Sequence, residues 1–135
     1  MMEIEIYVDG GARGNPGPAG GGFAVYTNGK LAIKGSVFFG EMTNNQAEYL
    51  ALREALRKTY AHYPEAKVRC LMDSKLVVEQ MAGNYKVKSP NIKTLHAEVR
   101  RIADQFPLFR IFHIPREQNR LADRLANEAM DRGEK

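Results

Sequence analysis

The order in which hydrophobic patterns follow one another constrains the fold of this chain more than any other feature. Residues 3–9 alternate apolar and polar side chains, as a half-buried strand does. Two further β-rich runs, 23–27 and 31–39, flank an Asn28-Gly29 pair that is typical of a hairpin turn. After residue 42, segments with helical spacing alternate with short apolar runs. This order predicts an α/β fold in which a mixed sheet carries helices on its faces.

The later segments carry start and stop signals. Thr43 and Gln46 have the spacing of a capping box that opens a helix, and Ser89-Pro90 places proline at the first position of another. The glycine-rich stretch 10–22, with seven of the chain's twelve glycines, is expected to be a turn region. Helices are expected at about 43–61, 74–82, 89–105 and 119–133, and strands at 68–72 and 108–114.

Composition bounds the class of protein. A length of 135 residues fits a single domain, 1–135. The lone Cys70 excludes an internal disulfide framework, and no segment approaches the roughly 18 apolar residues of a membrane span. We therefore expect a cytoplasmic protein, away from any membrane and compatible with a monomer. The net charge of +4 allows a polyanionic partner without demanding one.

Four acids fall at the ends or beginnings of predicted elements. Asp9 ends the first strand, Asp73 ends the fourth, and Glu48 and Asp123 lie in the first turns of two helices. Strand carboxyl ends and helix starts meet at one edge of an open α/β sheet, so these carboxylates can converge. If the four carboxylates converge, their like charges repel one another. Binding of hard divalent cations, which prefer oxygen ligands, would offset that repulsion. Each acid alone is also explained as a turn former, a cap or a helix-dipole partner.

Four segments together resemble type 1 ribonuclease H, in the family's order and from end to end of the chain. They are residues 7–17 (YVDGGARGNPG), 43–49 (TNNQAEY), 73–78 (DSKLVV) and 115–126 (PREQNRLADRLA). The resemblance implies a ribonuclease H-like fold with a five-stranded mixed sheet flanked by helices. It also implies an endonuclease that cuts the RNA strand of an RNA–DNA hybrid and leaves 5′-phosphate and 3′-hydroxyl ends.

The resemblance further implies a site for two Mg²⁺ ions, with Mn²⁺ as an alternative that wants similar oxygen ligands. Asp9 would bridge both ions, Glu48 and Asp73 would hold the ion on the leaving-group side, and Asp123 would hold the ion that activates water. These four residues would be both the metal ligands and the catalytic residues.

Two departures from the family pattern affect the expected mechanism. Many members carry a catalytic histidine on a flexible loop after the fifth strand, whereas here the loop is short and His113 falls within the strand. Arg116 is a candidate to lie near the phosphate in its place, but a guanidinium cannot transfer protons. Some members also carry a basic, tryptophan-containing protrusion where this chain has only the connection 84–88 and no tryptophan. The chain is therefore expected to be a short form that either binds its substrate less tightly or gains affinity from a partner.

Neutral amides and backbone groups suit recognition of 2′-hydroxyls, and helix N-termini suit phosphates. The amides of the first helix start are also explained by simple helix N-terminal preference. No phosphate-binding nucleotide motif accompanies the glycines, so no nucleotide cofactor is expected. The candidate substrate-binding residues are Gly11, Asn15, Thr43, Asn44, Asn45 and Arg116.

Two other functions remain open from the sequence. The same fold can serve as a non-catalytic nucleic-acid-binding module, although the presence of all four carboxylates argues against this. A related nuclease acting on double-stranded RNA is the second alternative.

Overall fold

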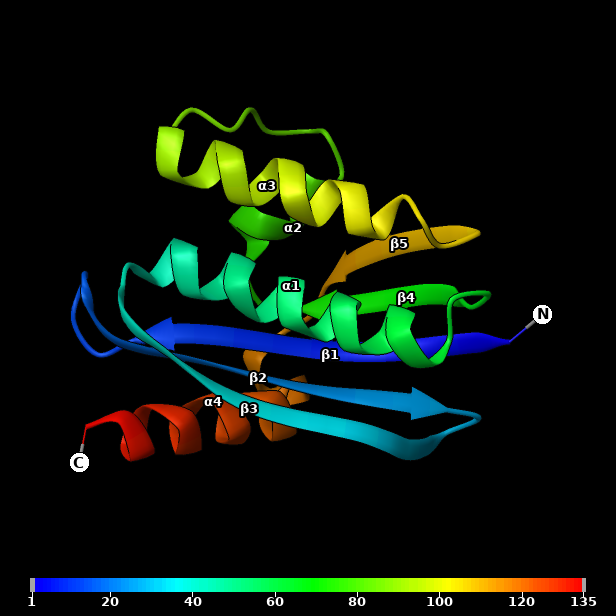
Figure 1. Cartoon of the computed structure of the whole chain (residues 1–135), viewed down its shortest axis with the longest axis horizontal. Helices are drawn as coiled ribbons and strands as arrows, with labels where there is room; N and C mark the ends of the chain where they lie inside the picture. The colour runs from blue at the N-terminus through cyan, green and yellow to red at the C-terminus, as the bar shows by residue number, and fades with distance from the viewer. Residues whose placement is uncertain (1, 135) are drawn as a thin grey trace.

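A computed structural model describes residues 2–134 and shows one five-stranded sheet flanked by helices (Figure 1). The sheet order is β3-β2-β1-β4-β5; β1 pairs antiparallel with β2 and parallel with β4. The predicted mixed sheet and element order are confirmed. The elements are β1 (Glu3–Ala12), β2 (Gly17–Thr27), β3 (Lys30–Met42), α1 (Asn44–His62), β4 (Lys67–Met72), α2 (Lys75–Met81), α3 (Pro90–Ala103), β5 (Leu108–His113), the 3₁₀ turn η1 (Arg116–Gln118) and α4 (Arg120–Gly133).

The central strand β1 holds the layers together. Its residues Ile4, Ile6 and Val8 are each at most 1% exposed and pack in the main core with α1. Because side chains alternate along a strand, Tyr7 and Asp9 point to the opposite face of the sheet. The face that carries Asp9 is therefore fixed by burial of the other face, since a slip of one residue would expose the apolar side chains.

Helices α1 and α3 lie on one side of the sheet, and α4 lies on the other, behind β2 and β3 in Figure 1. Three consecutive glycines of β2 show the alternation directly. A Cβ atom on Gly21 would meet Ala51 of α1, whereas one on Gly22 would overlap the Ala122 carbonyl of α4. Both helices therefore approach the backbone of β2 closely, from opposite faces.

The expectation that residues 10–22 form a turn region is wrong. Most of the stretch is paired strand, at the end of β1 and in β2, and only residues 13–16 connect the two. Gly14, with φ 118°, provides the turn conformation that most residues avoid. Several other glycines are there because helices pack against strand backbone, a tertiary requirement that local turn statistics do not contain.

Helix boundaries agree with the predictions within a few residues. The capping box is present: the Thr43 hydroxyl accepts from Gln46 N at 3.2 Å, and Thr43 N donates to the Gln46 side chain at 2.9 Å. Ser89 makes no side-chain cap bond although Pro90 follows it. α3 ends at Ala103, two residues before the predicted end, and the loop after β5 contains the 3₁₀ turn η1.

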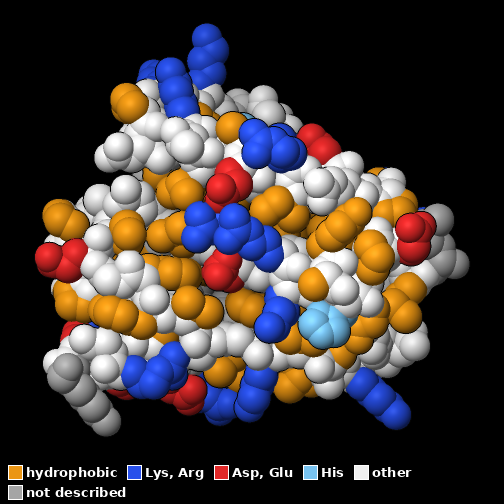
Figure 2. Space-filling model, in the orientation of Figure 1, with side chains coloured by type: hydrophobic (Ala, Val, Ile, Leu, Met, Phe, Trp, Pro, Cys, Tyr) orange, Lys and Arg blue, Asp and Glu red, His pale blue; other side chains and the backbone are white. Residues whose placement is uncertain are grey.

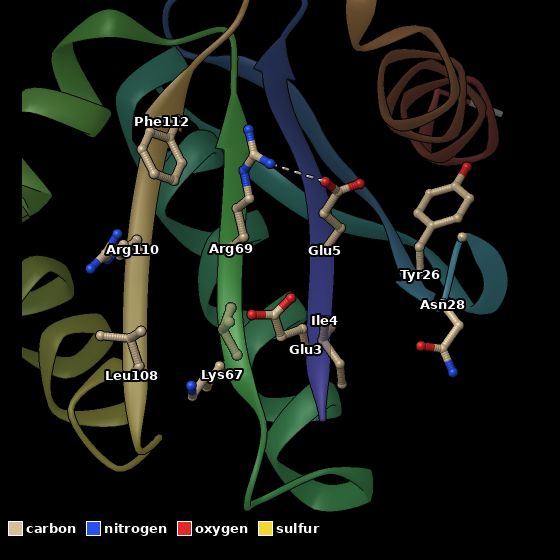
Figure 3. A pocket seen from close by; sticks show the side chains of 12 residues that line it. Glu3, Ile4, Glu5, Tyr26, Asn28, Lys67, Arg69, Leu108, Arg110 and Phe112 are labelled. Carbon is tan, nitrogen blue, oxygen red and sulfur yellow. Dashed lines mark ion pairs between the residues drawn. The ribbon is translucent and has the colours of Figure 1, made fainter. Parts of the chain in front are cut away.

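Among residues 2–134, no helix covers the α4 side of β4 and β5, and a shallow groove lies there (Figure 3). Arg69 crosses this groove, 3.5 Å from a Glu5 carboxylate oxygen and 5.2 Å from the centre of the Phe112 ring. Phe112 and Leu108 remain 39% and 38% exposed. On the opposite side, over α1 and α3, basic side chains are dispersed among acidic and apolar ones (Figure 2). Within residues 2–134, no helix is long and apolar enough to cross a membrane.

Candidate active site

Asp9, Glu48, Asp73 and Asp123 line one hollow at the edge of the sheet where β1 and β4 end. They come from β1, α1, the residue after β4, and α4. The structure thus brings together the four carboxylates that the sequence placed at strand ends and helix starts. Their roles as ligands and catalytic groups stay predictions.

Strand register and a glycine contact bring these acids together. β1 and β4 run parallel, with Val8 opposite Met72, so Asp9 and Asp73 are the next residues along two neighbouring strands. The prediction that Asp9 ends the first strand is wrong, because β1 continues to Ala12 in its pairing with β2. Gly10 lies under the start of α1, where a Cβ atom would overlap the Ala47 carbonyl. The missing side chain lets the helix come close enough to present Glu48 at the same edge.

The environment of the hollow raises the pKa of Asp9 and of Glu48. Burial raises the pKa of Asp9 strongly, and the nearby carboxyl groups of Asp73 and Asp123 raise it further. Burial also raises the pKa of Glu48, to about 7, with the Asp73 charge adding to the effect and a hydrogen bond with the Ser74 side chain opposing it. A partly buried site of this kind is costly to charge unless cations share it.

This donor set fits Mg²⁺. The ion prefers oxygen ligands and usually takes one or two carboxylates while keeping several waters. Within residues 2–134, no three His, Cys, Asp or Glu side chains are gathered into a ready-made cage for one ion. Carboxylates that are spread around one open hollow suit ions that complete their shells with water and substrate oxygens.

We predict that the metal-free protein loses stability as the pH rises from about 4 to about 9. The pKa values of Asp9 and Glu48 are higher in the folded chain than their ordinary values near 4, so the folded state binds more protons in this window. Their stabilising contribution is complete below about pH 4 and is lost as the pH passes the folded pKa values. Thermal melts in EDTA across this range measure the effect, and excess Mg²⁺ should flatten the slope.

A pH slope in EDTA that is unchanged in the double variant Asp9→Asn/Glu48→Gln would contradict this assignment. Asp104→Asn is the matched control, because Asp104 is an exposed carboxylate at the end of α3.

The predicted substrate residues divide into two groups. Gly11, Asn44 and Arg116 line the hollow with the carboxylates. Asn15 lies behind Asn44, whose backbone N donates to the Asn15 side chain at 3.1 Å, while the Asn44 side chain accepts from Ala12 N at 2.9 Å. Thr43 and Asn45 flank these residues at the start of α1 and do not line the hollow.

Arg116, rather than His113, lies at the site. An Arg116 guanidinium nitrogen lies 3.6 Å from a carboxylate oxygen of Asp123, and its side chain is 76% exposed. His113 belongs to β5, as the sequence predicted, and is not among the residues that line the hollow.

Three residues near the site escaped the sequence analysis. Arg13 and Asn127 line the hollow, and Asn119 is 1% exposed with its side-chain amide donating to the Val8 carbonyl at 2.9 Å. Asn127 follows Asp123 by one helical turn, a spacing that could have identified it. The contacts of Arg13 and Asn119 cross the fold, and no sequence spacing indicates them.

The chain is similar to ribonuclease H proteins over nearly its whole length. A family model described as reverse transcriptase-like matches residues 7–129. Ribonuclease HI of Halobacterium salinarum is 37% identical over 129 residues, which is 95% of this chain and 64% of that protein. Ribonuclease H of Hydrogenovibrio crunogenus is 32% identical over 146 residues, 97% of each chain.

Some relatives are much longer. The bifunctional protein Rv2228c of Mycobacterium tuberculosis is 43% identical over 132 residues, which is 96% of this chain and 36% of that protein. The chain therefore spans about a third of the length of that relative.

Solved structures agree with the sequence similarity. LC11-RNase H1 in complex with an RNA/DNA hybrid superposes with a TM-score of 0.93 at 43% identity, covering 98% of this chain and all of that one (100%). RNase H1 from Halobacterium salinarum gives a TM-score of 0.92 at 37% identity, covering 96% of this chain and 98% of that one.

Proposed function

Because the chain belongs to the ribonuclease H family, as a short type 1 member, we propose that it hydrolyses the RNA strand of RNA–DNA hybrids with the help of divalent metal ions. The observation that carries the proposal is the set of four carboxylates around one hollow, on a fold that superposes on a hybrid-bound relative. The reaction would leave 5′-phosphate and 3′-hydroxyl ends.

The causes of the raised pKa values support a division of roles. Both Asp73 and Asp123 raise the pKa of Asp9, which supports our assignment of Asp9 to the shared ligand position. The charge of Asp73 also acts on Glu48, which supports pairing these two on one side and Asp123 on the other. When bound, divalent ions would activate a water and stabilise the leaving oxygen of the phosphodiester.

The remaining residues of the hollow would orient the substrate. Gly11 offers backbone without a side chain, and Asn44 offers an amide at the start of α1, which suit an RNA backbone and its 2′-hydroxyls. Arg116 would hold a phosphate near Asp123 and would not move protons. Beside the hollow, Asn15 and Thr43 would bind phosphates of the DNA strand, and Asn45 would join Asn44 in recognising 2′-hydroxyls of the RNA.

A cleavage assay tests the proposal. The full chain is incubated with an end-labelled RNA–DNA hybrid, with and without Mg²⁺, beside Asp73→Asn and the exposed control Asp104→Asn. We expect Mg²⁺-dependent cleavage of the RNA strand by wild type and control, and a loss of at least roughly a hundred-fold in Asp73→Asn.

The same assay separates the alternatives. Hybrid binding without cleavage at any metal concentration would favour the non-catalytic module, and equal cutting of double-stranded RNA would favour the broader nuclease. Full activity of Asp73→Asn would overturn the assignment of the site while leaving the family intact.

A further inference from the structure

Arg13 connects the turn between β1 and β2 to helix α4. One of its guanidinium nitrogens lies 2.6 Å from an Asp131 carboxylate oxygen and donates to Glu134 at 3.0 Å. The other donates to the Asn127 side-chain oxygen at 3.2 Å. In Figure 1 this turn and the C-terminal part of α4 lie at the same end of the molecule. The Arg13 guanidinium therefore contacts two carboxylates and one amide, and it connects them to the turn that carries Arg13.

Asn127 continues the connection to the carboxylate cluster. Its amide nitrogen donates to the Asp123 backbone oxygen at 2.9 Å and lies 3.4 Å from the Asp123 carboxylate. A guanidinium can only donate hydrogen bonds and an ionised carboxylate can only accept them. A side-chain amide accepts through its oxygen and donates through its nitrogen. Only one orientation of the Asn127 amide satisfies both neighbours, so Arg13 fixes which end faces Asp123.

The turn is also held from its other side. Ala12 N donates to the Asn44 side chain, and Asn44 N donates to the Asn15 side chain. The connection between β1 and β2 is therefore anchored to the start of α1 and to α4 at once. These two helices supply Glu48 and Asp123, which both line the hollow.

We propose that Arg13 and Asn127 are positioning residues, which couple the glycine-rich turn to the orientation of the Asp123 carboxylate. The inference rests on the proposed nuclease function and names two residues that its carboxylate set does not include. Substrate backbone that settles on the turn would then hold Asp123 in its working orientation. Charge-assisted hydrogen bonds that form a network hold their side chains in place more firmly than isolated, exposed ion pairs do.

The test compares Asn127→Leu, Arg13→Met and the double variant in the full chain, with Arg124→Ala as control. Arg124 lies on the exposed side of the same helix, away from the hollow. Asn127→Leu should lower kcat about tenfold, because it removes a hydrogen bond to a charged group, and should change KM less than about twofold. Arg13→Met should lower kcat about threefold.

Coupling distinguishes positioning from general support of the fold. If Arg13 acts through Asn127, the double variant should be no worse in kcat than Asn127→Leu alone. The carboxyl ¹³C chemical shift of Asp123, measured without metal and during Mg²⁺ titration, should move in both single variants and stay unchanged in Arg124→Ala. Melting temperatures identify any variant that is simply less folded.

Two results would overturn the inference: losses of kcat that are additive in the double variant, or an Asp123 carboxyl chemical shift that is unchanged by both substitutions. Failure of the proposed function is a separate outcome. If wild type never cleaves a hybrid, kcat values cannot be compared. The Asp123 carboxyl chemical shift would still report whether Arg13 and Asn127 orient that carboxylate.

Discussion

Replacing Asp9 by asparagine is expected to abolish cleavage and to raise the melting temperature of the metal-free protein. Asp73 and Asp123 both act on Asp9, to which we assign the shared ligand position, so the change removes an oxygen ligand from both ions and kcat should fall by at least roughly a thousand-fold. The neutral amide also avoids the free-energy cost that burial and the Asp73 charge place on an ionised carboxylate at this position. Relief of about 1 kcal/mol would raise the melting temperature by a few degrees.

Single-turnover cleavage at saturating Mg²⁺ and thermal melts in EDTA at about pH 8 measure the two effects. Glu5→Gln is the control, because Glu5 lies on the same face of β1 but over the open groove, away from the hollow. Activity within tenfold of wild type, or a lower melting temperature in EDTA, would refute the shared ligand position that we assign to Asp9.

Replacing Gly10 by alanine should damage both stability and activity. The new methyl group would overlap the Ala47 carbonyl and come within 2.7 Å of Glu48 N, and helix backbone cannot rotate away as a flexible side chain can. Overpacking of this kind costs about 1–3 kcal/mol. The start of α1 must shift outward, which carries Glu48 away from Asp9, and a displacement near 1 Å can lower kcat about a hundred-fold.

Gly11→Ala is the matched control for stability, since its Cβ would make an ordinary 3.7 Å contact with the end of the Met130 side chain. Denaturant unfolding and single-turnover kinetics on both variants provide the comparison. If Gly10→Ala matched Gly11→Ala in its free energy of unfolding, the close approach of α1 to β1 would not have the importance that we give it.

Local sequence patterns were sufficient to predict the architecture. Alternation placed Ile4, Ile6 and Val8 in the core, and the Thr43–Gln46 pair located the start of α1. The rule that strand ends meet at one sheet edge then predicted that the four acids can converge. These features follow from contacts between residues close in sequence, or from the general geometry of sheets.

What the sequence did not reveal depends on contacts between distant segments. The glycines of β2 look like turn residues until α1 and α4 are seen to press on both faces of that strand. Arg13 looks like one more solvated charge until Asp131 and Asn127 are found beside it. The role of buried Asn119 is visible only in its hydrogen bond to the Val8 carbonyl, which lies far away in the sequence.

The placement of Asp123 on α4 has a consequence for biosynthesis. In the described part of the chain, β1 is made before the other elements and becomes the central strand, whereas α4 is made after them. Asp9, Glu48 and Asp73 can therefore assemble on a nascent chain well before the fourth acid is available. The proposed four-carboxylate site would therefore stay incomplete until α4 has packed against β2.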